Sequence, residues 1–203
     1  MPMFPLGTVL LPGEYLPLHV FEPRYRELVR DCMAGEPEFG VALIERGHEV
    51  GGGDSRFDVG CVARIVQLAE MTDGRFALAT VGVRRIRVGE WLPDDPYPRA
   101  DVDDWPDEPP AGDDVDRTEA VAVTLRRVLA MAAELGETVA PASEVTTDDD
   151  LVLTSYRLAA MAPVGPLDQL ALLAAPTVSA RLGHLGDFLA DTETVLATRL
   201  GGG

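Results

Sequence analysis

The pattern of apolar residues changes once along the chain, and this change constrains the fold more than any other feature. Up to about residue 104, apolar residues alternate with polar ones or form short runs, which is typical of β-strands. From about residue 117 they recur every three or four residues, which indicates amphipathic helices. The segment between, residues 94–116, holds ten acidic residues, five prolines and one arginine, a composition that cannot bury a core. We therefore predict a β-rich domain at 1–105, an acidic, proline-rich linker at 106–116 and a helical bundle at 117–203.

Turn signals divide the first domain into strands, which we expect at residues 4–11, 15–21, 39–44, 59–71, 75–88 and 97–105. Asp73-Gly74 between two alternating segments is a strong hairpin signal. Pro5 and Pro17 place the first two strands at sheet edges, because proline has no N–H to donate. Residues 47–55 are glycine-rich and predict a flexible loop, since no Lys-Ser or Lys-Thr pair follows to make a phosphate-binding loop.

One helix interrupts the strands and begins at Pro23, where a missing N–H is no loss. Its apolar residues fall on one helical face and are Tyr25, Leu28, Val29, Cys32 and Met33. In the second domain the same spacing predicts helices at 121–135, 152–160, 167–174 and 178–200. The sequence therefore predicts an α+β fold.

The charge composition excludes several classes of function. The chain has 34 acidic residues and 17 arginines, no lysine, and a net charge of −17. An acidic surface does not favour nucleic-acid binding, which needs cations to displace counterions. Without lysine these residues contain no P-loop, no Ser-Lys dyad and no Schiff base. No apolar run reaches the roughly 18 residues of a membrane span, and the N-terminus lacks the pattern of a signal peptide. We therefore expect a cytoplasmic protein without a membrane or nucleic-acid partner.

Side chains that could support catalysis or bind a metal are scattered. His19, His48 and His184 lie far apart in the sequence and form no metal-binding motif. Cys32 and Cys61 lie among apolar neighbours, which favours buried free thiols. No nucleophile stands beside a base in a known catalytic motif. We expect no enzyme activity, no metal and no cofactor.

Two features remain as candidates for a binding site. The first is the segment FEPRYRELV, where a strand meets a basic-faced helix and presents Phe21, Arg24 and Tyr25. The second is a row of arginines, with Arg84, Arg85 and Arg87 on one strand and Arg64 on the strand before it. Both patterns fit ion pairing on an acid-rich protein, and both also fit recognition of acidic or polar groups on a ligand.

The first 33 residues resemble the opening of the N-terminal domain of Lon proteases. The shared pattern is a proline-led apolar strand, a Pro-Gly turn, and LPLHVFEPRYR before a helix. FGVAL, DVGCVARI, DGRFALATVGVRRIRV and DDPYPRADV continue the match. SYRLAAMAP and LALLAAPTVSARLGHLGDFL extend it more loosely into the helical domain.

This resemblance implies a PUA-like β-barrel with an inserted helix, followed by a helical bundle. It also implies a substrate-recognition module that is separate from the ATPase and peptidase of the full protease. The function we expect is non-catalytic binding of unfolded or exposed polypeptide segments, in an adaptor role beside a protease or chaperone. The alternative is a small-molecule-binding or ligand-sensing domain. The contact surface could be an edge strand, the arginine row or a groove between the two domains, and self-association stays open.

Overall fold

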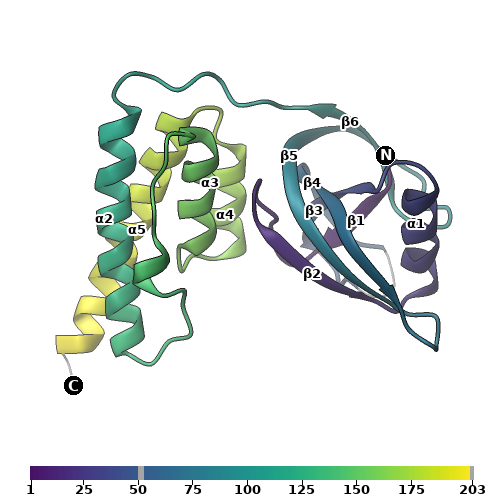
Figure 1. Ribbon diagram of the computed structural model, residues 1–203, viewed down its shortest axis with the longest axis horizontal. Coiled ribbons are helices and arrows are strands. Elements are labelled where there is room, and N and C mark those ends of the chain that lie inside the picture. The colour runs from purple at the N-terminus through teal and green to yellow at the C-terminus, as the bar shows by residue number, and fades with distance from the viewer. Residues whose placement is uncertain (50–52, 202–203) are drawn as a thin grey trace. The chain divides into compact units, whose positions relative to one another are not determined.

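The computed structural model describes residues 1–49 and 53–201, and the chain forms two compact units, Met1–Pro106 and Asp107–Gly203 (Figure 1). Residues 50–52 of the loop predicted at 47–55 lie outside the described residues, as do 202 and 203. The first unit contains the strands and the second is helical. The combination of a sheet and helices expected from the sequence is therefore confirmed.

The first unit is built on one six-stranded sheet. Its continuous order is β1-β3-β4-β5-β2, and β6 pairs with β5. β1 and β3 are parallel, whereas all other pairs are antiparallel. The strands are β1 (Met3–Leu6), β2 (Tyr15–Val20), β3 (Glu38–Arg46), β4 (Ser55–Glu70), β5 (Phe76–Leu92) and β6 (Arg99–Asp104).

The sheet curls, as the long strands β4 and β5 show in Figure 1, but it does not close into a continuous barrel. The start of β1 reaches β6 only through an isolated bridge between Pro2 and Arg99. Among the described residues, β1 and β2 are the two ends of the ladder. The β-barrel expected from the sequence is therefore not closed between these two strands. Proline accounts for it, because Pro5 in β1 and Pro17 in β2 cannot donate to a further strand.

The hairpin between β4 and β5 is the element that the sequence predicted best. Gly74 has φ 77°, and its N–H donates to the Met71 carbonyl at 2.9 Å. Asp73 accepts from the Arg75 backbone N–H at 3.1 Å, which fixes the turn. The antiparallel pairing runs from Glu70 beside Phe76 to Val59 beside Arg87, with two register shifts on the way. The Asp-Gly signal is therefore confirmed.

The first predicted strand is too long. β1 ends at Leu6, and the apolar residues that follow are buried in irregular structure. The reason is the close crossing of Leu11 over β5, because a Cβ on Gly82 would lie 2.2 Å from the Leu11 carbonyl oxygen. Gly82 also bonds to the chain beyond it, accepting from the Gly13 N–H at 2.8 Å and donating to the Glu14 carbonyl at 2.9 Å. Burial at these positions thus comes from a crossing rather than from a ladder.

Helix α1 (Pro23–Ala34) follows β2 and buries Tyr25, Leu28, Val29 and Cys32, as the spacing predicted. Met33 is the exception, since half of its side chain is exposed. It lies at the border of the apolar stripe, in the same last turn as the buried Cys32. The first unit has a cluster of buried core residues, which includes Met3, Ala42, Val62, Ile86, Val88 and Ala100.

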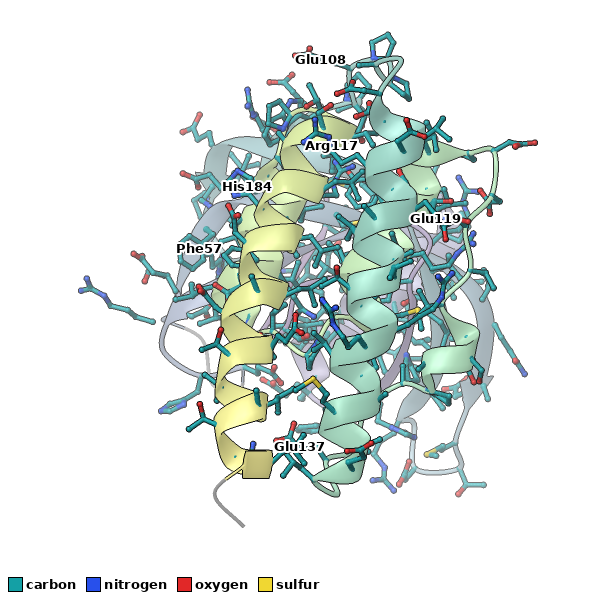
Figure 2. The ribbon with its side chains drawn as sticks, turned by 90° about the vertical axis from the view of Figure 1, so that its left-hand side faces the viewer. Phe57, Glu108, Arg117, Glu119, Glu137 and His184 are labelled. Carbon is teal, nitrogen blue, oxygen red and sulfur yellow. The ribbon has the colours of Figure 1, made fainter. Side chains whose placement is uncertain are left out.

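Residues 107–201 of the second unit form four α-helices and one 3₁₀ turn. α2 and α5 lie side by side and run in the same direction, as Figure 2 shows from the face that carries Glu119 and His184. Near their starts Ser179 donates to Asp114, and near their ends Arg199 pairs with Glu137. The elements are α2 (Asp114–Glu134), η1 (Ala142–Glu144), α3 (Leu151–Met161), α4 (Pro166–Ala174) and α5 (Val178–Gly201).

The structure differs from the predicted linker at both ends of residues 106–116. α2 begins at Asp114, so the last three residues of that range are helical. Asp107 is held inside the second unit, where it accepts from Arg181 and from the Tyr156 hydroxyl at 2.8 Å. The Arg181 side chain is fully buried, and a buried cation requires a counter-ion. An acidic segment that looks solvated in the sequence thus supplies that counter-ion.

Candidate functional site

The two ends of the sheet border a hollow of about 210 Å³. Phe4 and Leu6 line it from β1, and residues 17–20 line it from β2. Tyr25 contributes from α1, so the two ends of the ladder and one helix contribute to one surface. This hollow, called the seam hollow below, exists because the sheet does not close. The remaining lining residues are Phe21, Glu22 and Glu49.

Tyr25 forms the rigid wall of the seam hollow. Its ring stacks on Phe4 with centroids 4.1 Å apart and planes 11° apart, and the Arg24 guanidinium lies 4.5 Å from its other face. Only 3% of Tyr25 is exposed, and this burial raises the pKa of the hydroxyl to about 12. Tyr25 is therefore neutral at physiological pH, held between an aromatic ring and a cation.

Arg24 braces the rim of the seam hollow. Its Nε donates to Glu22 Oε2 at 3.2 Å, and its Nη2 donates to the Glu49 carbonyl at 3.3 Å. With the Tyr25 ring beneath it, the guanidinium is held from three sides. Arg24 therefore ties the loop at Glu49 to α1, and its charge is already matched by Glu22.

Phe21 is the exposed apolar residue of the site. Its side chain is 54% exposed, directly after β2, and it borders a second hollow of about 160 Å³ as well as the seam hollow. Met71, at the β4–β5 turn, is 40% exposed and lines the second hollow. The other lining residues there are His19, Val20, Arg75 and Phe76. An exposed apolar side chain that lines two small hollows is a typical contact point for another chain.

The arginine row lies elsewhere and is engaged within the protein. Arg64 and Arg84 share Glu38, with nitrogen–oxygen distances of 2.8 and 2.6 Å, and Arg84 also bonds Asp104 at 2.8 Å. Burial alone would raise the pKa of Glu38, but the hydrogen bonds from Arg84 and Arg64 outweigh it and lower that pKa. Of the two interpretations of the sequence pattern, ion pairing is the one that the structure shows for Arg64 and Arg84.

Arg85 and Arg87 hold the end of the first unit. Arg85 is 2% exposed, and its Nε donates to the Trp105 carbonyl at 2.7 Å. Both guanidinium groups lie over the Trp105 ring. The Cζ atom is 4.2 Å from the ring centroid in Arg85 and 3.4 Å from it in Arg87. These contacts secure the segment after β6. None of the four arginines of the row lines either hollow.

The structure thus brings together Phe21, Arg24 and Tyr25 and separates them from the row. Sequence reasoning missed Phe4, Glu49 and Met71, which reach the same surface from β1, from the loop after β3 and from the β4–β5 turn. No local pattern marks them, because their proximity follows from the sheet order. The exposure of two large apolar side chains, Phe21 and Met71, identifies the surface in the structure.

Within residues 1–49 and 53–201, no group of three or more histidine, cysteine, aspartate or glutamate residues is arranged to hold a metal ion. Within the same ranges, every helix is too short or too polar to cross a bilayer.

The comparisons with known proteins agree with this architecture. The family model described as the ATP-dependent protease La (LON) substrate-binding domain matches residues 1–191 of the 203. The chain belongs to this family. The resemblance to Lon N-terminal domains found in the sequence is therefore confirmed.

Solved structures of the LON domain show the same fold. The Lon N-terminal domain protein from Xanthomonas campestris is 28% identical, with a TM-score of 0.64 over 91% of this chain and 95% of its own. The N-terminal domain of a Mycobacterium avium complex Lon protease is 20% identical, with a TM-score of 0.68 over 94% of this chain and 97% of its own. The latter likeness concerns the fold alone.

Curated relatives are much longer proteins. A Lon protease of Anaeromyxobacter dehalogenans is 32% identical over 137 residues, which is 66% of this chain and 16% of the relative. Lon protease 1 of Herpetosiphon aurantiacus is 26% identical over 200 residues, 94% of this chain and 24% of the relative. The chain spans about a sixth to a quarter of these relatives, and the match falls within the substrate-binding domain.

Proposed function

We propose that this LON domain is a non-catalytic module that binds exposed or unfolded polypeptide segments at the seam hollow. The observation that carries the proposal is Phe21, whose half-exposed ring lines two hollows at the open end of the sheet. The family description, a substrate-binding domain, supports the same class of partner. Segments that expose apolar side chains are a feature of unfolded chains, whereas folded proteins bury most of theirs.

The backbone of β2 adds a second kind of contact. Gly82 bonds with the chain at Glu14, and hydrogen-bonded pairs alternate along antiparallel strands. The backbone groups of Tyr15, Pro17 and His19 therefore point away from β5, toward the open side of the ladder. An extended segment could pair with them by strand addition. Pro17 has no N–H, so this pairing is weaker than on an ordinary edge and the apolar contact at Phe21 must contribute most of the affinity.

The size of the hollows favours a side chain over a drug-sized ligand. Pockets for small molecules usually enclose about 300–1,000 Å³. The two hollows here measure about 210 and 160 Å³, and Phe21 lines both. Small hollows that share lining residues suit successive side chains of an extended segment. Their size therefore supports the polypeptide hypothesis more than the small-molecule one.

An adaptor role extends the same proposal. The curated relatives are Lon proteases, and we propose that this domain presents bound segments to a protease or chaperone in an analogous way. The 203 residues contain no lysine, so they provide neither a P-loop nor a Ser-Lys dyad. We also propose that the curled sheet with α1 beside it is a PUA-like arrangement.

The proposal is tested by fluorescence anisotropy with one labelled model protein in two states. In the first state it is reduced and unfolded, and in the second it is native. We expect the unfolded form to bind, and to stay bound at high salt because the contact is mainly apolar. The absence of binding at high micromolar concentration would refute the proposal. A small molecule that co-purifies and is released only on denaturation, seen by native mass spectrometry, would favour the alternative.

A further inference from the structure

We infer that the seam hollow selects polypeptide segments in which an apolar side chain lies next to lysine or arginine. This inference rests on the proposed function and adds the chemical class of the preferred segment. It reverses the sign expected from the arginine row, which predicted acidic ligands. The argument depends on two carboxylates at the rim of the hollow, Glu22 and Glu49.

Each rim carboxylate uses one oxygen inside the protein. Glu22 Oε2 accepts from Arg24 Nε at 3.2 Å, and Glu49 Oε1 accepts from the Gly7 N–H at 2.6 Å. Both side chains lie beside apolar lining residues, among them Phe4 and Leu6. An apolar side chain inserted here would bring its neighbours in the segment to this rim. A neighbouring ammonium or guanidinium group would meet two anions that are already held in position.

The cations near the hollow do not cancel this field. Arg24 forms its ion pair with Glu22. The partner of the Glu49 carboxylate is the backbone N–H of Gly7, which carries no net charge. Arg75, at the second hollow, is paired with Asp73 at 2.7 Å. At the rim of the seam hollow the two carboxylates, Glu22 and Glu49, therefore outnumber the one guanidinium group, that of Arg24.

The charge of the whole unit acts in the same direction. Residues 1–106 contain 18 acidic residues and 11 arginines, a net charge of −7 with histidine neutral. A surface with an excess of one sign attracts segments of the opposite sign and raises their association rate, and salt screens this effect. An apolar segment with basic neighbours thus gains at both long and short range, whereas one with acidic neighbours is repelled.

The test uses three short labelled peptides with the same central leucine, flanked on both sides by lysine, by glutamine or by glutamate. We expect affinity to fall in that order at low salt, and the difference to shrink at high salt. The double variant Glu22→Gln with Glu49→Gln should weaken the lysine peptide by about twofold to fivefold per carboxylate, the range of a partly exposed ion pair. The glutamine peptide should be unaffected by these substitutions.

A matched control changes the same charge elsewhere in the unit. Glu45 and Glu90 are exposed and line neither hollow, so Glu45→Gln with Glu90→Gln should leave the lysine peptide within about twofold of wild type. Thermal unfolding of both double variants checks that the fold is intact. Equal affinity of the three peptides, or an equal loss in both double variants, would overturn the inference while leaving the proposed function in place. If no peptide and no unfolded protein binds, the proposed function fails first.

Discussion

Replacing Phe21 by alanine should separate binding from stability. The ring is 54% exposed, and a phenylalanine side chain buries about 150–250 Å² in full, so a bound segment would cover about 110 Å² of it. At about 25 cal/mol per Å² this corresponds to roughly 2.7 kcal/mol. Ordering of the bound segment offsets part of that gain, and we expect a loss of about 1–2.5 kcal/mol in binding, or about 5- to 70-fold in Kd. The free energy of unfolding should change by about 1 kcal/mol or less, since half the ring is already in water.

The assay is an anisotropy titration with the unfolded model protein, beside chemical denaturation of the same variant. Met33→Ala is the control, because Met33 is also half exposed, lies on α1 and lines neither hollow. Its affinity should match wild type. If Phe21→Ala and Met33→Ala both bind as wild type does, the seam hollow is not the contact surface. If Phe21→Ala instead loses several kcal/mol of stability, the reasoning about its exposure is wrong.

Three further predictions concern the folded state. Arg181→Met removes the cation that pairs with Asp107, a nearly buried carboxylate, and we expect the free energy of unfolding to fall by about 3–5 kcal/mol, measured by denaturant titration. The pKa of Glu38 in the folded protein lies below its ordinary 4.5, so its stabilising contribution is present above pH 4.5 and is lost as pH falls through the lowered pKa. Glu38→Gln should therefore make the free energy of unfolding depend less on pH in that acid range. An unchanged pH dependence would contradict the ion pairs assigned to Glu38. Burial raises the pKa of both Cys32 and Cys61 to about 12. A thiol reagent at pH 8 should therefore modify the two cysteines only as fast as the protein opens. Rapid modification of the native protein would show that the thiols are accessible.

Local patterns predicted the elements whose structure is decided by neighbouring residues. The Asp73-Gly74 hairpin and the buried face of α1 are read from a few consecutive positions, and both are present. The first strand was placed five residues too far, because burial of Leu11 comes from its crossing over Gly82, 71 positions later in the sequence. A contact between residues so far apart in the sequence produces no periodic pattern of apolar residues. The same holds for Asp107, whose partner Arg181 lies in the last helix.

The candidate site was only half accessible to sequence reasoning. Phe21 and Tyr25 could be named because they lie at a visible junction of strand and helix. The arginine row was identified by charge alone, but charge does not reveal partners, and Glu38 and Trp105 reach it through strand pairing and the chain after β6. The seam hollow could not be inferred at all, since it requires that β1 and β2 be the two ends of the ladder.

The position of β1 and β2 at opposite ends of the ladder also sets when the surface comes into existence during synthesis. β1 needs residues 40–43 as its partner, and β2 needs residues 76–81. Both strands are synthesised before their partners, since β1 has to wait for β3 and β2 has to wait for β5. Pairings of such long sequence separation form slowly. Phe21 and its hollows are therefore assembled late, so a nascent chain that has not yet reached residue 81 carries the apolar segment without the surface that uses it.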